Sequence, residues 1–269
     1  MIRIEQVGLV AGGRMLLDGI DLTIRAGETT VLIGPNGAGK STLLRLIGGA
    51  ARPSSGRILI DGIPVERYSP ARLAHRRAVL SQHHDGGESF TIEELVRLGL
   101  RGMDRRVSSA VRRAWVDELL ASFGLEGWNN RIVGTLSGGE RQRAHLARVL
   151  VQLRADADEE PPGALLLDEP IAAQDPAQQL RVLNEAQAYA AAGGTVLIVL
   201  HDLNWAARVA DRMIALKHGR VVADGSPSAI FSRSTLATVF EVELDPCSAP
   251  ADRPFVLPQM ARSISDSFS

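Results

Sequence analysis

The chain has 269 residues, enough for one hydrophobic core or for a domain with a subdomain. Its 30 Lys and Arg balance 31 Asp and Glu, and only 4% of its residues are aromatic, so the composition argues against a basic nucleic-acid or membrane surface and against a base-stacking platform. No apolar run approaches ~18 residues, the length needed to span a bilayer, and the N-terminus lacks a signal-peptide core. The single cysteine, Cys247, cannot form an internal disulfide and suits a reducing cytosol.

Residues 1–33 predict antiparallel strands that end at a glycine-rich loop. Turn signals stand at Gly12-Gly13 and at Ala26-Gly27. The last of these strands, residues 29–33, is expected to be buried, and a helix is predicted from Lys40 to Ile47, directly after the loop.

The loop between this strand and this helix has the sequence GPNGAGKST, which fits the phosphate-binding pattern G-x-x-x-x-G-K-[ST]. Glycines let the backbone wrap closely enough for its N–H groups to face phosphate oxygens. The helix N-terminus adds partial positive charge, Lys40 is expected to reach the β- and γ-phosphates, and Ser41 is expected to ligate Mg²⁺. The sequence therefore predicts a nucleotide site formed by Gly34, Pro35, Asn36, Gly37, Ala38, Gly39, Lys40, Ser41 and Thr42.

The next segment returns to a buried strand. Ser69-Pro70 is an N-cap followed by proline, and it starts a helix predicted to run through Arg77. Residues 78–80 are expected to form a buried strand that places Ser81 and Gln82 at its end.

A helical subdomain is predicted to be inserted after this strand. Residues 91–94 form a capping box that opens one helix, and a second helix is expected over about 108–123. The basic residues of this subdomain are Arg97, Arg101, Arg105, Arg106, Arg112 and Arg113. They are open to two interpretations: a surface that binds phosphates or anionic lipid, or a solvated face with local ion pairs.

The second half of the chain alternates helices with buried strands. An amphipathic helix is expected over residues 140–153, and a polar surface loop over 154–163. The apolar residues 164–167 predict a buried parallel strand that runs into Asp168 and Glu169.

A long helix is predicted to begin at Asp175-Pro176 and to stop at Gly193-Gly194. Residues 195–200 form the next buried strand and lead to His201, and a further helix follows to Ala210. A hairpin over 212–224 and short helical stretches in the tail complete the predicted elements.

The sequence LSGGERQR at residues 136–143 resembles the signature motif of the ATP-binding cassette (ABC) family. The order of motifs along residues 1 to about 225 is also similar to that family. The resemblance implies an α/β P-loop NTPase core with an N-terminal antiparallel β subdomain and an inserted α-helical subdomain at about 90–145. The ATPase domain is accordingly expected over residues 1–225, followed by a short C-terminal tail over 226–269.

The resemblance also implies a role for each motif residue. Asp168 is expected to hold Mg²⁺ together with Ser41, and Glu169 to orient or deprotonate the attacking water. Gln82 resembles the residue that reaches both Mg²⁺ and water, and His201 resembles the histidine that touches the γ-phosphate. The residues that contact ATP held by the other subunit are expected to be Ser137, Gly138 and Gly139, which implies a head-to-tail homodimer.

Several positions depart from the family pattern. Ala11 stands where many relatives place an aromatic residue that stacks on adenine. Ile171 and Gln174 replace the usual Thr and Leu before Asp175. The pair His83-His84 is open to interpretation as a metal cluster or as a loop that touches a partner, and the absence of a helical ligand spacing favours the loop.

Among ABC proteins, the single P-loop and the compact helical subdomain favour the ATPase subunit of an importer over an exporter subunit or a non-transport member. The implied partners are a second copy of the chain, two transmembrane permease subunits and, indirectly, a substrate-binding protein, without nucleic acid. Such a subunit works at the cytoplasmic face of the inner membrane. Residues 90–99 are similar to ATPase subunits of iron-chelate and cobalamin importers. Residues 156–163 and 256–259 are most similar to ATPase subunits of haem importers, and iron–siderophore or cobalamin import is the alternative.

Overall fold

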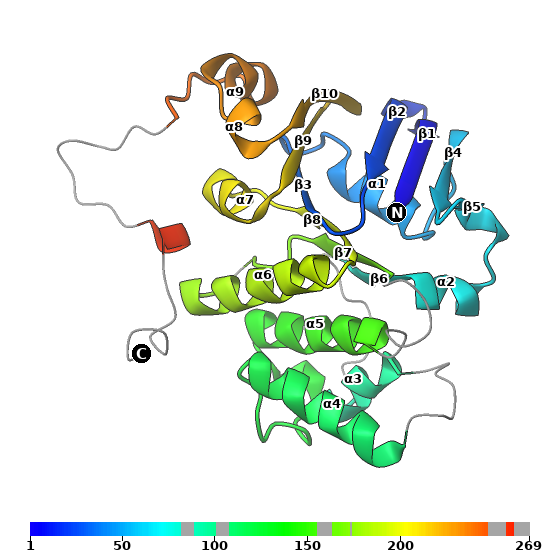
Figure 1. Ribbon diagram of the computed structural model, residues 1–269, viewed down its shortest axis with the longest axis vertical. Helices are drawn as coiled ribbons and strands as arrows, with labels where there is room; N and C mark the ends of the chain where they lie inside the picture. The colour runs from blue at the N-terminus through cyan, green and yellow to red at the C-terminus, as the bar shows by residue number, and fades with distance from the viewer. Residues whose placement is uncertain (82–88, 101–107, 155–162, 173, 247–256, 261–269) are drawn as a thin grey trace.

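A computed structural model of the protein describes residues 1–81, 89–100, 108–154, 163–172, 174–246 and 257–260. The predicted site residue Gln82 and the pair His83-His84 lie outside the described residues, as do Arg101, Arg105 and Arg106. Figure 1 shows two sheets in the upper part of the molecule and a layer of helices below them. No helix within the described ranges is long and apolar enough to cross a membrane.

The first sheet is antiparallel and has the strand order β2-β1-β4-β5. Its strands are β1 (Ile2–Ala11), β2 (Arg14–Ile24), β4 (Ser55–Ile60) and β5 (Ile63–Pro64). The turn between β1 and β2 is made by Gly12 and Gly13, whose φ angles of 56° and 73° suit glycine in a two-residue hairpin turn. This sheet is the predicted N-terminal antiparallel β subdomain.

The second sheet has the order β10-β9-β3-β8-β7-β6, and only its edge strand β10 is antiparallel. Its strands are β3 (Thr29–Ile33), β6 (Arg77–Leu80), β7 (Ala164–Asp168), β8 (Thr195–Val199), β9 (Arg212–Lys217) and β10 (Arg220–Gly225). β3, β7 and β8 are buried along their whole length, as expected for a parallel sheet covered on both faces. The prediction of an antiparallel strand over residues 29–33 is therefore wrong, because β3 pairs in parallel with β8 and β9.

The helices begin largely where capping residues predict. Ser69, Thr91, Ser108, Asp175 and Asp202 each accept a hydrogen bond from a backbone N–H of the helix that follows. These helices are α2 (Pro70–Arg76), α3 (Ile92–Leu98), α4 (Ser109–Ser122), α6 (Pro176–Ala191) and α7 (Leu203–Val209). The remaining helices are α1 (Lys40–Ile47), α5 (Gly138–Arg154), α8 (Pro227–Ile230) and α9 (Arg233–Phe240), with short 3₁₀ turns η1 (Val65–Arg67), η2 (Val133–Thr135) and η3 (Pro258–Met260).

Several helix boundaries differ from the prediction by one or two residues, and two of these differences bear on neighbouring elements. α2 ends at Arg76 because Arg77 has extended backbone angles, φ −155° and ψ 145°, and opens β6. α5 begins at Gly138, two residues before the predicted start at Glu140.

The buried side chains form two clusters on the two faces of the second sheet. One cluster joins this sheet to α3, α4, α5, α6 and α7, and contains Phe123 and Trp205. The other packs the first sheet and α1 against the opposite face, and contains Ile4, Leu44 and Leu197. α3 and α4 lie beyond α5 in Figure 1, which agrees with a helical subdomain inserted after β6.

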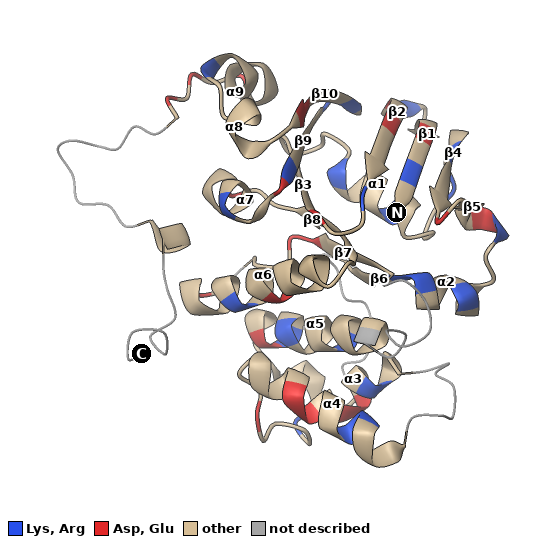
Figure 2. Ribbon diagram, in the orientation of Figure 1, with Lys and Arg blue, Asp and Glu red and all other residues tan. Residues whose placement is uncertain are grey.

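The charges of this helical layer are partly paired with one another. Glu93 lies 3.3 Å from Arg97 and 3.8 Å from Arg113, measured between its Oε1 and the arginine nitrogens. Figure 2 shows these charges on α3 and α4, at the lower end of the molecule. For these two arginines the local ion pairs favour the interpretation as a solvated face.

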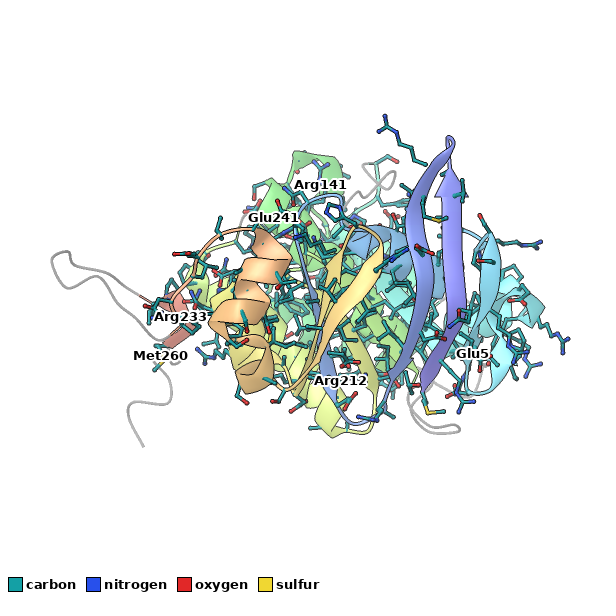
Figure 3. The ribbon with its side chains drawn as sticks, turned by 90° about the horizontal axis from the view of Figure 1, so that it is seen from above. Glu5, Arg141, Arg212, Arg233, Glu241 and Met260 are labelled. Carbon is teal, nitrogen blue, oxygen red and sulfur yellow. The ribbon has the colours of Figure 1, made fainter. Side chains whose placement is uncertain are left out.

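The C-terminal segments lie far from the first sheet. Figure 3 shows Arg233 of α9 and Met260 of η3 on one side of the molecule and Glu5 of β1 on the other.

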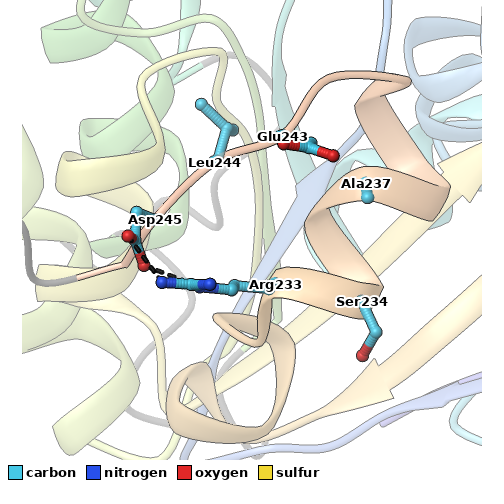
Figure 4. A pocket seen from close by; sticks show the side chains of 6 residues that line it. All are labelled: Arg233, Ser234, Ala237, Glu243, Leu244 and Asp245. Atoms are coloured by element: carbon cyan, nitrogen blue, oxygen red, sulfur yellow. Dashed lines mark hydrogen bonds and ion pairs between the residues drawn. The ribbon is translucent and has the colours of Figure 1, made fainter.

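A pocket lies between α9 and the chain that follows it, and Arg233 and Asp245 are among its lining residues (Figure 4). Nη2 of Arg233 lies 2.6 Å from Oδ2 of Asp245. This pocket is formed by the tail alone and contains none of the predicted site residues.

Candidate functional site

The ends of the parallel strands bring the predicted motifs to one edge of the second sheet. The P-loop follows β3, Asp168 ends β7, and His201 follows β8 by two residues. Since β3 and β7 flank β8 in the same direction, their carboxyl ends lie together. This edge of a parallel sheet is where ligands bind in open α/β folds.

Close packing of the P-loop requires glycine at two positions. Gly34 has φ 143°, and a Cβ there would lie 2.0 Å from the main-chain oxygen of Leu216 in β9. Gly39 has φ 103°, and its Cβ would lie 2.9 Å from the main-chain oxygen of Leu16 in β2. The loop is also tied to the β9–β10 turn, since Gly219 N–H donates to the main-chain oxygen of Ala38 at 3.0 Å. The neighbouring strands therefore fix the course of the P-loop backbone.

Lys40 lies inside the curve of this loop. Its Nζ donates to the main-chain oxygens of Gly34 at 2.8 Å and Pro35 at 2.9 Å. Burial lowers the pKa of the Lys40 ammonium, and the carboxylates of Glu169 and Asp168 oppose this effect. The N-cap of α1, Gly39, offers no side-chain acceptor, and the first turn of the helix carries no acidic residue. The loop and the start of α1 thus bring together N–H groups and positive charge, and no side chain of the cap or first turn neutralises them.

Asp168 and Ser41 lie in contact beside this loop. Ser41 Oγ donates to Oδ1 of Asp168 at 3.1 Å, although the two residues are far apart in the sequence. Asp168 is only 3% exposed. Burial raises the pKa of the Asp168 carboxyl and Glu169 adds to this rise, whereas the bond from Ser41 and the charges of Lys40 and His201 oppose it.

Glu169 is held by contacts to its backbone and its side chain. It has φ 51°, in the left-handed region that non-glycine residues seldom adopt. Its N–H donates to the main-chain oxygen of Val199 at 3.1 Å, and its main-chain oxygen accepts from Nε2 of Gln142 at 2.7 Å. Its carboxylate oxygen Oε1 lies 2.5 Å from Nε2 of His201, which is half-exposed. The structure therefore brings Glu169 and His201 together at the ends of β7 and β8.

The residues of the signature motif start α5. Ser137 Oγ accepts from the N–H of Glu140 at 3.4 Å, and Glu140 Oε2 accepts from the N–H of Ser137 at 2.8 Å. This reciprocal pair is a capping box, and it explains why the helix starts at Gly138. The side of the helix start that carries Ser137 and Gly138 is exposed. Gly138 has open space where a Cβ would stand.

The sequence profile described as ABC transporter matches residues 17–172, more than half of the chain. The chain belongs to the ABC transporter family. Membership confirms the prediction of a P-loop NTPase fold with ATP-hydrolysing function.

Two relatives are similar in sequence to this protein over nearly its whole length. The Hemin import ATP-binding protein HmuV of Rhodopseudomonas palustris strain BisB18 is 46% identical over 95% of the chain and 94% of the relative. The protein of the same name from Bradyrhizobium diazoefficiens is 46% identical over 94% of the chain and 92% of the relative.

Solved structures of ABC proteins share the fold. The ATP-binding subunit of an ABC transporter superposes with a TM-score of 0.75 at 26% identity, over 89% of this chain and 95% of that one. A dimeric bacterial ABC transporter cassette superposes with a TM-score of 0.75 at 28% identity, over 84% of this chain and 99% of that one.

Some residues at this ABC site were not foreseen. Gln142 lies within the signature stretch, yet only the structure shows its amide on the backbone of Glu169. Gln174, noted as a departure from the family pattern, donates to Gln142. Ile171, the other departure, is buried. Ala11 lies exposed at the end of β1, opposite Arg14 of β2.

Proposed function

We propose that this protein is the ATP-hydrolysing subunit of a haem importer. The observation that carries the choice of haem is the similarity over nearly the whole chain to relatives named for hemin import. In this proposal two copies form a head-to-tail dimer beneath two transmembrane permease subunits, at the cytoplasmic face of the inner membrane. A substrate-binding protein delivers haem to the permease. The ATPase domain spans residues 1–225, and residues 226–269 form the tail.

The residues present at the P-loop fit a complex of ATP with Mg²⁺. Mg²⁺ is commonly held by one or two protein oxygens together with phosphate oxygens and water, rather than by a full protein cage. Ser41 and Asp168 supply a hydroxyl and a carboxylate that already lie 3.1 Å apart. When bound, Mg²⁺ neutralises charge that develops on the phosphate oxygens. Asp168 must be ionised to serve as a ligand, so binding of the cation opposes the raised pKa of this carboxyl.

The protein groups around the γ-phosphate then have separate tasks. The N–H groups of the P-loop and the ammonium of Lys40 bind the phosphates, and Lys40 exchanges its present bonds to loop carbonyls for phosphate oxygens. Glu169 accepts the proton of the attacking water or orients that water. His201, which contacts the Glu169 carboxylate, holds this group and donates to the γ-phosphate. Gln82 reaches the water and Mg²⁺, and Ser137, Gly138 and Gly139 contact the ATP of the partner subunit.

Iron–siderophore or cobalamin import is the competing function, and growth on defined iron sources separates the two. The gene is deleted, and the strain is complemented with the wild-type gene or with Glu169→Gln. We expect deletion to abolish growth on haem as sole iron source and to leave growth on an iron–siderophore intact. Wild type should restore growth on haem, and Glu169→Gln should not, because an amide keeps the shape of the side chain but not its basicity.

Each other outcome is informative. Normal use of haem with loss of siderophore use would favour the alternative substrate. Restoration of growth by Glu169→Gln, combined with an ATPase rate near wild type in the purified transporter, would show that Glu169 is not the base. The variant protein should still bind ATP, because its P-loop is unchanged.

A further inference from the structure

Gln142 and Gln174 form a ring of hydrogen bonds with the backbone that follows Glu169. Gln142 Nε2 donates to the main-chain oxygen of Glu169 at 2.7 Å. Gln174 Nε2 donates to Oε1 of Gln142 at 3.2 Å and to the main-chain oxygen of Pro170 at 2.9 Å. Two side-chain amides therefore donate to two consecutive main-chain carbonyl groups. One amide belongs to the N-terminal part of α5, and the other to the residue before the N-cap of α6.

The ring determines which end of each amide faces the backbone. A carbonyl oxygen only accepts, so each of the two main-chain oxygens requires an NH₂ group. Gln174 places its NH₂ between the Pro170 carbonyl and Oε1 of Gln142. Because Oε1 of Gln142 faces this donor, the NH₂ of Gln142 faces the Glu169 carbonyl. Reversal of the Gln174 amide would set its oxygen against two other oxygens, so the donor of Gln174 supports the same orientation of Gln142 that the Glu169 carbonyl requires.

The Glu169 backbone needs such support. Its φ of 51° is costly for a residue with a side chain, and it persists only where the surroundings enforce it. The Val199 carbonyl holds the N–H of Glu169, and His201 contacts its carboxylate. The peptide group on the C-terminal side of Glu169 accepts a hydrogen bond from Gln142, and Gln142 in turn accepts one from Gln174.

We propose that Gln174 is a positioning residue for the base of ATP hydrolysis. It acts through Gln142, whose amide fixes the peptide group that sets the direction of the Glu169 side chain. This inference rests on the proposed role of Glu169. Leucine, the usual residue at this position in the family, has no donor for Gln142, so this chain adds a polar link between the signature helix α5 and the base.

Kinetics of the purified transporter with Gln174→Glu and Gln174→Leu test the proposal. Glutamate has the shape of glutamine but accepts hydrogen bonds only, so both bonds from position 174 are lost. We expect Gln174→Glu to lower kcat about tenfold, with KM for ATP within about twofold of wild type because the P-loop is unchanged. Gln174→Leu should lower kcat by a smaller factor, since it removes the donor without adding an acceptor. The matched control Gln178→Glu introduces the same charge one turn later, and its kcat should stay within twofold of wild type.

Two further measurements separate positioning from a merely structural role. In the double variant Gln142→Leu with Gln174→Glu, the second substitution should lower kcat by less than twofold, because Gln142 is the group through which Gln174 acts. The kcat of Gln174→Glu relative to wild type should rise as pH is lowered, because a protonated carboxyl regains one donor. The same rise in Gln178→Glu would assign the pH effect to charge alone.

The proposal is overturned if kcat of both Gln174 variants stays within twofold of wild type. It is equally overturned if kcat falls only in step with a lower melting temperature, or if the two substitutions act independently in the double variant. Glu169→Gln is measured in the same series. Activity of that variant near wild type would refute the role of Glu169 itself, whereas an inactive Glu169→Gln beside active Gln174 variants would refute only the positioning role.

Discussion

Asp168 is a buried carboxylic acid, and burial raises its pKa above the ordinary carboxyl value. Its raised pKa means that the folded, nucleotide-free protein holds a proton more tightly there than the unfolded chain does. The stabilisation from this proton is fully present below the ordinary carboxyl pKa, and it is lost as pH rises through the raised pKa. Wild type should therefore lose stability at neutral pH relative to a variant with a neutral side chain.

Thermal unfolding of Asp168→Asn tests this sign. Asn keeps an oxygen that can accept from Ser41, so the contact between the two residues can persist. Without nucleotide, the melting temperature of the variant minus that of wild type should increase by a few degrees between pH 4 and pH 8. With ATP and Mg²⁺ wild type should gain more stability than the variant, because binding of ligands stabilises the folded state. A difference that stays constant with pH would contradict the cause assigned to the pKa shift.

Ala11 leaves the expected adenine position without a ring. It lies exposed opposite Arg14, and the sequence contains no Phe, Tyr or Trp before Tyr68. A base–aromatic stack contributes roughly 1–3 kcal/mol in nucleic-acid binders. We expect wild type to bind ATP and GTP within a few-fold of each other, and Ala11→Tyr to tighten both, as measured by nucleotide titration. Strong ATP selectivity that disappears in Arg14→Ala would show instead that the guanidinium stacks on the base.

The predictable site residues are those that follow a buried strand or match a spaced motif. Lys40, Asp168 and His201 could be placed together because parallel strands end at one edge of a sheet. The amide contacts of Gln142 and Gln174 could not be predicted in this way. A glutamine that bonds to a main-chain carbonyl of another element leaves no periodicity in the sequence, and its partner depends on tertiary packing.

At the scale of elements, helix starts were predictable because capping is local. Ser69, Thr91 and Asp175 each accept a hydrogen bond from the N–H group three residues later. Strand partners were harder to predict, because pairing is non-local. The residues 29–33 follow an antiparallel hairpin, yet they pair with strands more than 150 residues later along the chain.

The segment Leu257–Met260 is an element whose contribution can be measured. Gln259 is 8% exposed, and its Nε2 donates to Oδ2 of Asp202, the N-cap of α7, at 2.9 Å. Its main-chain oxygen accepts from Arg208, which lies over the ring of Trp205 at 5.4 Å. The C-terminal segment is thereby joined to both ends of α7.

Gln259→Ala should lower the free energy of unfolding by about 0.5–1.5 kcal/mol, because it removes one side-chain hydrogen bond and leaves the acceptor Asp202 partly exposed to water. Urea unfolding of purified protein measures this difference. Met260→Ala is the matched control, since Met260 is 75% exposed and the next residue in the chain. Equal stability of the two variants would mean that the contact of Gln259 with α7 contributes nothing measurable.

At the scale of the whole molecule, the proposed head-to-tail dimer can be tested through its composite site. In such a dimer each site would combine the P-loop of one copy with Ser137, Gly138 and Gly139 of the other. Gly138 is exposed and has open space at the position of a Cβ, so Gly138→Asp should fold normally. Its carboxylate would repel phosphate. Lys40→Ala instead removes a charge-assisted phosphate contact.

The placement of these two substitutions, in one copy or in different copies, decides whether the dimer is head-to-tail. In a Glu169→Gln background, which should trap ATP, copies with Lys40→Ala are mixed with copies that carry Gly138→Asp. One composite site then contains both defects and the other contains neither, so the mixture should form an ATP-dependent dimer on size-exclusion chromatography, although neither variant should do so alone. The control mixes copies that carry both substitutions with copies that carry neither. Heterodimers from each mixture are isolated by a different tag on each copy, and the ATP that they retain is compared. In the control heterodimer each composite site has one defect, so it should retain less ATP. Equal retention of ATP by the two kinds of heterodimer would contradict a site shared between copies.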